Sequence, residues 1–311
     1  INKLTLEDLQ RYVDCRSQDA GKRGKTLSPA TIKKELTTLR TAWNWARDAG
    51  YLTRNFPSKG LRYPKSAEKP PFQTWEEITR KIETHQLSED QQADLWECLF
   101  LTTSEIQELL ADVKQAALHP CLFPMFAFAA HTGARRSEIL RSQVEDIDLV
   151  GRTITIREKK RVRGRNTTRT VPISPVLHEV LVPWLATSGS VGHTFSLGLG
   201  VHRSKKHRTS AEPLTRDEAH DHFKRTLADT KWSTIRGWHV FRHSFCSNCA
   251  AAGIDQRMIN AWVGHQTEEM VRRYRHLIPN QQQEAISEVF ESTSAINPRT
   301  QEASIRSVNP I

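Results

Sequence analysis

The sequence predicts a mainly helical protein of the α+β class, with a helical N-terminal domain and a larger, mostly helical domain that holds a small antiparallel β-hairpin. Three observations lead to this prediction. Apolar residues recur at helical spacing through most of the chain, they alternate at strand spacing around residues 153–174, and a proline-rich segment separates two helical regions. A chain of 311 residues is long enough for two ordinary domains.

Residues 1–56 are expected to form the N-terminal helical domain. The stretch LTLEDLQRYVD carries apolar residues at helical spacing, and Thr5 near its start is a suitable N-cap. After a polar, basic loop, Ser28 followed by Pro29 predicts the start of a second helix. The apolar face of this helix is predicted to contain Ile32, Leu36, Leu39, Trp43 and Ala46.

The segment PSKGLRYPKSAEKPP, residues 57–71, is expected to be an interdomain linker. It contains four prolines and four cationic residues, and few apolar ones. Because proline interrupts helices and sheets, a compact element is not expected here. The larger domain is therefore predicted to cover residues 72–285, followed by a C-terminal tail over residues 286–311.

The larger domain is predicted to begin with helices. Thr74, with Glu77 three residues later, forms a capping-box pattern, and TTSEIQELLADV begins another helix in the same way. The residues between Thr84 and Pro120 are expected to be helical, although the sequence assigns them no function. The segment HTGARRSEIL is then expected to form a turn that enters a short helix.

The clearest strand pattern follows this turn. TITIREKK alternates apolar and polar residues, RTVPIS is expected to be a second strand, and RVRGRNTT between them is expected to be a basic hairpin tip. A stretch rich in Gly, Ser and His around Ser190 predicts a long loop. Helices are expected again up to about Val289.

The composition favours a nucleic-acid partner. The formal net charge is +10, and a basic protein attracts polyanions, although a basic enzyme without such a partner is the alternative. On the second predicted helix, three cations lie off the apolar face and are candidates for contact with a DNA backbone. They are Lys33, Lys34 and Arg40.

Several features indicate an intracellular, cytoplasmic protein. No apolar run approaches the roughly 18 residues that a membrane helix needs, and no signal peptide is visible. The five cysteines are odd in number and lack a framework spacing, which is typical of a reducing compartment. Because residue 1 is Ile rather than Met, we expect a fragment that lacks an N-terminal element.

Three short patterns resemble ligand sites but are not expected to bind ligands. DAGKRGKT resembles a phosphate-binding loop, yet it has Asp19 where the motif needs Gly, and no buried strand precedes it. CSNC has zinc-like spacing but no second pair of ligands. His239 and His243 are spaced like a metal pair on a helix, but Arg242 would place a positive charge beside the ion. We therefore predict no metal and no cofactor.

Basic residues gather at two other places. TGARRSEIL sets Arg135 at the start of a helix with Glu138 on the same face, which alone is compatible with a surface ion pair. In the hairpin, strand alternation puts Lys160 on the side of the strand's apolar residues and Lys159 on the other side. The hairpin cations expected to contact phosphate are Lys159, Lys160, Arg161, Arg163, Arg165 and Arg169.

Nearer the C-terminal end, HVFRH carries His239 and Arg242, and the Gly-His pair ending at His265 precedes Tyr274 by nine residues. Tyrosine, with a pKa of about 10, is a poor nucleophile at neutral pH and needs cations and a base nearby. Arginines bind phosphate oxygens bidentately, and fixed cations stabilise the charge of a phosphorane-like transition state. Each residue taken singly is an ordinary polar residue on a helix. Together they suggest attack by the tyrosine on the phosphorus of a phosphodiester.

In order and spacing, these motifs resemble those of the tyrosine recombinases, also called the phage integrase family. The resemblance rests on TGARRSEIL, the strand-borne lysine, HVFRH, VGH and RRYRH, and it covers about Phe72 to Pro279. The N-terminal helices are similar to the family's core-binding domain with its first helix missing.

The resemblance implies a role for each motif residue. Arg135 and Arg242 would hold the scissile phosphate, and Tyr274 would attack it to give a 3′-phosphotyrosyl link and a free 5′-hydroxyl. Glu138 would support the arginine, and His243 would be structural.

Three further roles follow from the same resemblance. Lys160, which strand alternation favours over Lys159 as the catalytic lysine, would protonate the leaving 5′-oxygen. His239 would act as general acid and base toward Tyr274, and His265 would hydrogen-bond the phosphate. No ATP is implied, because the phosphotyrosine retains the energy of the broken bond, and no metal is implied, because the arginines replace it.

The resemblance also implies double-stranded DNA as the partner. Four protomers would act on two duplexes, with monomers or dimers off DNA and with accessory DNA-bending proteins as further partners. The tail over residues 286–311 would dock onto a neighbouring protomer.

Three alternatives remain open. Type IB topoisomerases use a similar set of residues to relax supercoils, but the Gly-His pair and the core-binding-like helices argue against them. A DNA-binding protein without catalysis would have no need of Tyr274. An RNA-binding module lacks support because no RNP-type aromatic strand is present. The sequence identifies neither the DNA site nor the direction of the reaction.

Overall fold

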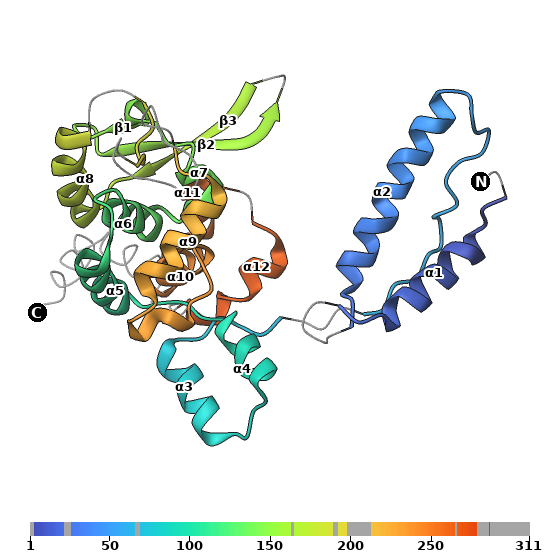
Figure 1. Ribbon diagram of the computed structural model, residues 1–311, viewed down its shortest axis with the longest axis horizontal. Helices are drawn as coiled ribbons and strands as arrows, with labels where there is room; N and C mark the ends of the chain where they lie inside the picture. Colours follow the sequence, from blue (N-terminus) through green and yellow to red (C-terminus); the bar gives the residue numbers. More distant parts are fainter. Residues whose placement is uncertain are drawn as a thin grey trace, which may run out of the picture. The chain divides into compact units, whose positions relative to one another are not determined.

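The protein is represented by a computed structural model that describes residues 3–21, 26–65, 69–162, 165–188, 192–197, 213–264, 266–278 and 286. The chain divides into two compact units, residues 1–69 and residues 70–311. Over the described residues both units are mainly helical, and a three-stranded antiparallel sheet lies in the second (Figure 1). The predicted fold class is therefore confirmed.

Unit 1 consists of two helices, α1 (Leu6–Gln18) and α2 (Pro29–Asp48). Both begin at the predicted residues: the side chains of Thr5 and Ser28 each accept a hydrogen bond from a backbone N–H of the first helical turn. Such bonds satisfy amides that have no partner inside the helix, which explains why the helices start here.

An apolar core and one ion pair join the two helices. Arg16 on α1 binds Glu35 on α2 at 2.8 Å. Leu39, which was predicted on the apolar face, is instead 44 % exposed, so that part of the prediction is wrong. The core consists of Leu9, Val13, Ile32, Leu36, Trp43, Leu52 and Phe56.

The first part of the proline-rich segment is fastened to unit 1. Leu61 and Tyr63 pack against its core. Between them, the backbone of Arg62 exchanges two hydrogen bonds with the side-chain amide of Gln10, at 2.9 and 3.0 Å. Residues 57–63 are therefore held against the helices by both apolar and polar contacts.

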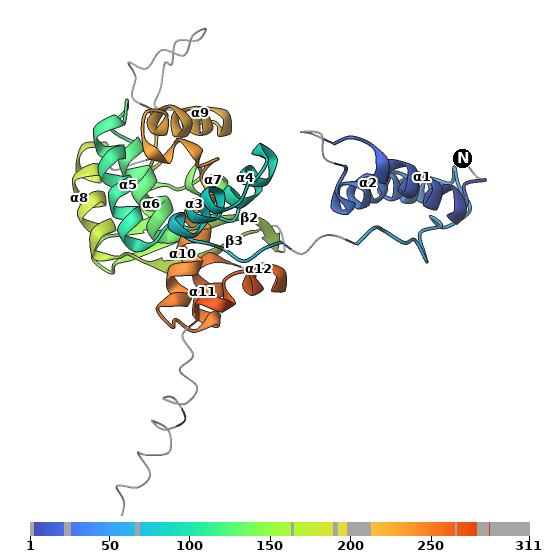
Figure 2. The ribbon, with the colours of Figure 1, turned by 90° about the horizontal axis from the view of Figure 1, so that it is seen from below.

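The core of unit 2 is built around α6 (Leu122–Thr132), whose sequence LFPMFAFAAHT is apolar on all sides. Such a helix must be buried on all sides, and α6 contacts α5 (Thr103–Ala116), α8 (Pro175–Ser188) and α10 (His239–Ala251). Figure 2 shows α5, α6 and α8 lying side by side. The end of α6 leads directly into the candidate site.

Before α6, unit 2 has the predicted helices. α3 (Trp75–Thr84) begins with the expected capping box at Thr74, and α5 begins with a capping box at Thr102. The segment between Thr84 and Pro120 is helical, as predicted, and contains α4 (Glu89–Trp96) together with α5. α5 packs on α6, so this segment completes the core.

The sheet has the order β1–β2–β3 and is antiparallel throughout. Its strands are β1 (Ile147–Asp148), β2 (Thr153–Val162) and β3 (Arg165–Pro172). The strands extend further than predicted, because RVRGRNTT was expected to be a tip and most of it belongs to β2 and β3. The pairing is irregular between Arg157 and Arg161 of β2.

The remaining elements of unit 2 follow the sheet. The expected long loop around Ser190 lies mostly outside the described residues, as does the tail after Ile286. No described helix combines the length and the apolar character that crossing a bilayer requires. The further elements are α7 (Arg136–Ile139), α9 (Arg216–Leu227), α11 (Gln256–Val263), α12 (Glu268–Arg272) and three 3-10 turns, Val144–Asp146, Lys231–Thr234 and Arg275–Leu277.

Candidate active site

The turn between α6 and α7 sets the direction of Arg135. Gly133 ends α6 with a φ of 60°, in the left-handed region. A Cβ added there would lie 2.9 Å from the ring of Phe245 and 3.1 Å from Val263, so both the conformation and the space require glycine. Arg135 directly precedes α7, and its side chain is 40 % exposed.

Glu138 binds Arg135 through both of its carboxylate oxygens. One carboxylate oxygen accepts a hydrogen bond from the guanidinium of Arg135 at 2.9 Å, and the other accepts one from its backbone N–H at 2.8 Å. Burial alone would raise the pKa of Glu138, but bonds from Arg169 and Arg135 outweigh it and leave the pKa below its usual value. Glu138 is therefore a buried carboxylate that stays ionised.

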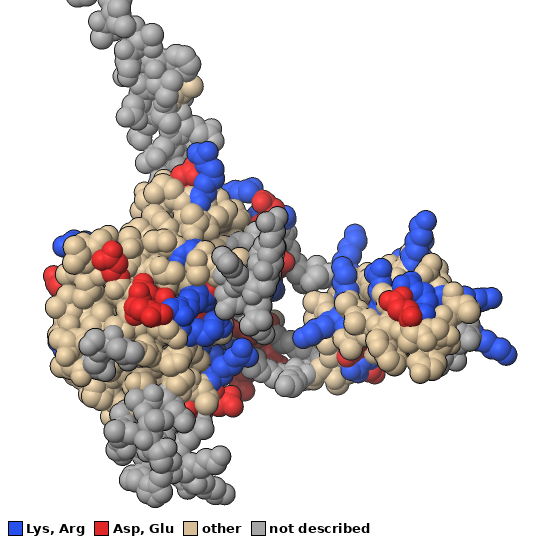
Figure 3. All heavy atoms as spheres, turned by 90° about the horizontal axis from the view of Figure 1, so that it is seen from above, with Lys and Arg blue, Asp and Glu red and all other residues tan. Residues whose placement is uncertain are grey.

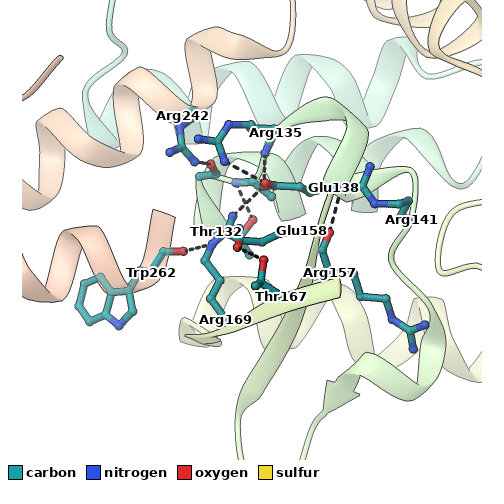
Figure 4. Close-up of polar contacts among 12 residues, drawn as sticks. Thr132, Arg135, Glu138, Arg141, Arg157, Glu158, Thr167, Arg169, Arg242 and Trp262 are labelled. Carbon is teal, nitrogen blue, oxygen red and sulfur yellow. Dashed lines mark hydrogen bonds and ion pairs between the residues drawn. The ribbon is translucent and has the colours of Figure 1, made fainter. Parts of the chain in front are cut away.

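Arg242, on the first turn of α10, faces the same turn. It is 5 % exposed and donates a hydrogen bond to the carbonyl oxygen of Gly133 at 3.0 Å (Figure 4). Burial, and then the positive charge of Arg135, lower the pKa of Arg242 to about 10. Arg242 remains protonated at neutral pH, so the structure brings two guanidinium ions together at the α6–α7 turn.

His239 begins α10, one turn before Arg242. Burial of its ring, and then the positive charges of Arg242 and Arg135, lower the pKa of His239 to about 4, although much of the residue's surface is exposed. The imidazole is therefore neutral at pH 7 and able to accept a proton. Its ring contacts that of His243 at a centroid distance of 4.6 Å, and His243 in turn contacts Phe72 at 4.4 Å.

Among the described residues, no group of three or more His, Cys, Asp or Glu side chains could hold a metal ion. His243 lies against an aromatic ring, as expected for a packing residue. Cys246 and Cys249, the pair in the CSNC pattern, are packed in an apolar cluster, and burial raises the pKa of Cys249 to about 12.

Tyr274 is placed differently from the arginines. It follows α12, is 0 % exposed, and packs in an apolar cluster with Phe72, Ile259 and Val263. Burial raises its pKa to about 12. The phenol cannot contact DNA from this position.

The hydroxyl of Tyr274 is held by two glutamines. It donates a hydrogen bond to Gln266 and accepts one from the side-chain amide of Gln256 at 2.9 Å. Gln266 also donates to the sulfur of Cys246 at 3.1 Å. The structure thus brings Arg135, Arg242 and His239 together, while the hydroxyl of Tyr274 is bonded to other groups.

The other predicted site residues are only partly described. Lys159 and Lys160 belong to β2, but their side chains lie outside the described part of the chain, as do those of Arg161 and Arg165. Residues Arg163 and His265 lie wholly outside it. The alternation used to prefer Lys160 crosses the irregular pairing between residues 157 and 161, so the choice between Lys159 and Lys160 stays a prediction.

Arg169 was expected to contact phosphate, and this is wrong. Its side chain is 7 % exposed and bound to Glu138 and Glu158. The signal was present in RTVPIS: alternation puts Arg169 on the same face as Val171 and Ile173, which are buried. Gln256 and Gln266 were missed because nothing in their sequence context distinguishes them from surface amides.

On unit 1, the three candidate DNA contacts are exposed on α2. Lys33 and Arg40 are two helical turns apart, and Lys34 is adjacent to the first. Lys and Arg side chains project from the surface of this unit (Figure 3). Their position is compatible with phosphate contact but carries no sequence information.

Comparison with known proteins identifies the family. Residues 99–281 match the phage integrase family. The chain is 31 % identical over 182 residues to the type 1 fimbriae regulatory protein FimB of Escherichia coli K12, covering 58 % of this chain and 82 % of that protein. It is 21 % identical over 291 residues to a tyrosine recombinase of Pseudothermotoga lettingae, covering 93 % and 86 %. The chain belongs to the phage integrase family of tyrosine recombinases.

Solved structures share the fold. The Tn1549 transposon integrase in complex with transposon right end DNA matches with a TM-score of 0.56 and 15 % identity, covering 94 % of this chain and 87 % of that one. The XerH site-specific recombinase bound to a palindromic difH substrate matches with a TM-score of 0.55 and 15 % identity, covering 92 % and 73 %. These similarities extend over both units.

Proposed function

We propose that this chain is a site-specific DNA recombinase that cleaves and rejoins double-stranded DNA through a 3′-phosphotyrosyl intermediate at Tyr274, without metal or ATP. The observation that carries the proposal is the meeting of Arg135, Arg242 and a neutral His239 around one glycine turn. Family membership and the DNA-bound relatives support it.

The two arginines supply the electrostatic part of the reaction. Attack on a phosphodiester builds negative charge on the non-bridging oxygens, and cations that are already in place stabilise it without reorganisation. Arg242 is fixed by burial and by the Gly133 carbonyl, and Arg135 by Glu138. Each guanidinium also has N–H groups left to bind oxygens bidentately.

The proton transfers complete the reaction. The O–P bond to Tyr274 forms while the bond from phosphorus to the 5′-oxygen breaks, and His239, neutral at pH 7, takes the phenol proton. Lys160 gives a proton to the leaving 5′-oxygen, and His265 hydrogen-bonds the phosphate. Return of a 5′-hydroxyl reverses the same steps and joins the strands.

Tyr274 has to leave its cluster before it reacts. The hydroxyl must exchange Gln256 and Gln266 for the scissile phosphate, and the ring must leave the contacts that bury it. We propose that DNA binding drives this change, because the phosphate supplies a new partner for the phenol only on DNA.

The proposal extends to the other parts of the chain. The duplex is held by residues 1–56 and by the part of residues 72–285 that carries Arg135 and Arg242. Residues 57–71 connect these two parts, and Lys33, Lys34 and Arg40 contact the DNA backbone. Lys159, Arg161, Arg163 and Arg165 add phosphate contacts from the hairpin. Four protomers act on two duplexes, and residues 286–311 dock onto a neighbour.

A covalent-adduct assay tests the proposal. The protein is mixed with nicked duplexes from the DNA that flanks its own gene and is then run on denaturing gels, with Tyr274→Phe as the matched control. An adduct that requires Tyr274 establishes the nucleophile and locates the site. Tight, salt-dependent binding without an adduct on any duplex would contradict the chemistry and favour a DNA-binding protein. Relaxation of plasmid without a specific site would favour a topoisomerase.

A further inference from the structure

Arg169 of β3 lies at the centre of a polar network that joins three segments of unit 2 (Figure 4). Its Nε donates to the carbonyl oxygen of Trp262 at 2.6 Å, Nη1 to Glu158 at 3.2 Å, and Nη2 to Glu138 at 2.7 Å. Every nitrogen of the guanidinium therefore has an acceptor within the protein. With a side chain 7 % exposed, Arg169 does not have the free face that binding a DNA phosphate requires.

The first connection runs through Glu138 to Arg135. One oxygen of the Glu138 carboxylate accepts a hydrogen bond from Arg169, and the other accepts one from the guanidinium of Arg135. The side chain of this carboxylate is 3 % exposed, and without Arg169 its remaining ion pair among the described residues would be the one with Arg135. Arg135 would be drawn onto Glu138 and neutralised by it, so less of its charge would remain for a phosphate.

The second connection runs to the end of α11. The Trp262 carbonyl belongs to the last turn of this helix, where carbonyls lack helical partners, and Arg169 supplies one. Gly264 follows with a φ of 79°, and a Cβ there would lie 2.7 Å from the Glu158 carboxylate. The glycine therefore allows the turn that leads to His265 to pack directly on the network.

The third connection runs to the hairpin. Glu158 of β2 accepts from Arg169 and also from the hydroxyl of Thr167 on β3, at 2.7 Å. It lies at the start of the irregular pairing between β2 and β3, two residues before Lys160. The Arg169 side chain thus contacts Glu138, which binds Arg135, the end of α11 that leads to His265, and Glu158, which precedes Lys160 on β2.

We infer that Arg169 is a positioning residue for the reaction: it holds Arg135 through Glu138, and it holds the turn before His265 and the strand before Lys160 against the same point, without touching DNA. The inference rests on the proposed function. A small displacement of reacting groups slows a reaction by about 100-fold, so such a residue has a large effect without contacting substrate. The competing explanation is a buried ion pair that contributes only to folding.

Two substrates separate these explanations. One is a duplex that gives an adduct with the unchanged protein, and the other is the same duplex with a methylphosphonate at the scissile position, which lacks one negative oxygen. Arg169→Met is expected to slow adduct formation on the phosphodiester by about 100-fold, and on the methylphosphonate by much less. Arg135→Ala is expected to show the same difference between the two substrates. Arg169→Lys, which keeps the charge but not the three-way geometry, is expected to be intermediate.

Arg157→Met is the matched control. Arg157 is also an arginine of the sheet that binds two carboxylates, Asp146 and Glu145, but among the described residues its side chain makes no hydrogen bond to Glu138, Glu158 or Trp262. It is expected to leave both rates unchanged. If Arg169→Met slows both substrates equally, or lowers the fraction of active protein without changing the rate constant, the inference is overturned.

A measurement on the free protein needs no reaction. Amide hydrogen exchange over residues 135–140 and 262–264 is expected to become faster in Arg169→Met and not in Arg157→Met, while α6 stays protected in both. Unchanged exchange overturns the inference whatever the adduct assay shows. Faster exchange without any adduct from the unchanged protein supports positioning by Arg169 and contradicts the proposed function, so the two failures are distinguishable.

Discussion

The arginine side and the tyrosine side of the candidate site are assembled to different degrees. Arg135 and Arg242 are fixed at a turn between two core helices, and their partners are backbone carbonyls and a buried carboxylate. Tyr274 lies in a separate apolar cluster with its hydroxyl on two glutamines. Folding therefore brings the two arginines together and leaves Tyr274, the proposed nucleophile, in a separate, buried position.

The elements on the two sides explain this difference. Arg242 is on α10, which has 13 residues and packs directly on the 11-residue α6. Arg135 precedes α7, which has only 4 residues but follows α6 directly and is held by the buried Glu138. Tyr274 lies between α12, which has 5 residues, and a 3-residue turn. Helices so short have little stability of their own, so their position depends on side-chain contacts that a ligand is able to replace.

Arg273, the residue before Tyr274, is attached to the start of unit 2. Arg273 donates to the carbonyl of Pro70 at 2.9 Å, its carbonyl accepts from the N–H of Phe72 at 2.9 Å, and its guanidinium lies 3.9 Å from the Phe72 ring. The position of Tyr274, the proposed nucleophile, is thus coupled to the residues that begin this unit.

The largest expected effect is on the arginine side. Arg242→Lys keeps a positive charge but loses the planar fork and the geometry of the Gly133 bond. Adduct formation is expected to slow by about 100- to 1,000-fold, as for loss of one fixed donor to the transition state. The rate is measured under single-turnover conditions on a duplex that the unchanged protein cleaves.

The tyrosine side provides the control for that variant. Amide exchange over residues 266–278 is expected to be the same in Arg242→Lys as in the unchanged protein, because within the described part of the chain the Arg242 side chain bonds Gly133 and none of these residues. Faster exchange there would show that the two sides are not independent and would contradict the comparison.

A smaller effect of opposite sign is expected from Gln256→Leu. The change removes the bond to the Tyr274 hydroxyl, and a bond of this kind contributes about 1 kcal/mol, so release of the phenol becomes about fivefold easier. Where release limits the rate, adduct formation is expected to become faster by about that factor. Gln92→Leu, which removes an amide bond to the Leu87 carbonyl at a place remote in sequence, is the control.

Slower adduct formation in Gln256→Leu would mean that this amide assists the attack rather than the resting state. A change in binding to the duplex, measured by its salt dependence, would instead indicate a wider structural effect. Either result would remove the distinction drawn here between a fixed and a releasable half of the site.

The arginine side was largely predictable from the sequence, because the turn and the helix start that position its residues depend on neighbouring residues in the chain. Gly133 followed by Arg135 and Glu138 predicts a turn and a helix start, and both form. The capping residues of unit 1 and the fold class were predictable for the same reason, since each depends on residues within one turn of one another.

The tyrosine side was not predictable, because it depends on contacts between distant segments. Tyr274 meets Gln256 and Phe72 through tertiary packing that no periodicity encodes. Arg169 shows the intermediate case: strand alternation placed it on the buried face, but its charge suggested phosphate contact. A buried arginine is tolerated only with acceptors nearby, and those came from three separate segments.

The smallest expected effects are on stability, and the two sides respond to opposite ends of the pH scale. His239 has its pKa lowered from 6.5 to about 4, so between these values the unfolded chain binds a proton that the folded chain does not. Stability is therefore lost as the pH falls through this window. The urea midpoint is expected to fall less between pH 7 and pH 5 in His239→Asn than in the unchanged protein.

Tyr274 has its pKa raised from 10 to about 12, so between these values the folded chain keeps a proton that the unfolded chain has lost. Its contribution is complete below pH 10 and is lost as the pH rises toward 12. Tyr274→Phe is expected to have a lower urea midpoint at pH 7, because two glutamine bonds are lost, and to lose less stability between pH 9 and pH 11. All other titrating groups, Arg242 included, are common to both chains, so the difference between the two curves isolates the phenol. If both chains lose the same stability between pH 9 and pH 11, Tyr274 already reaches solvent. The proposed nucleophile would then be no more buried than Arg135, and the contrast between the two sides would fail.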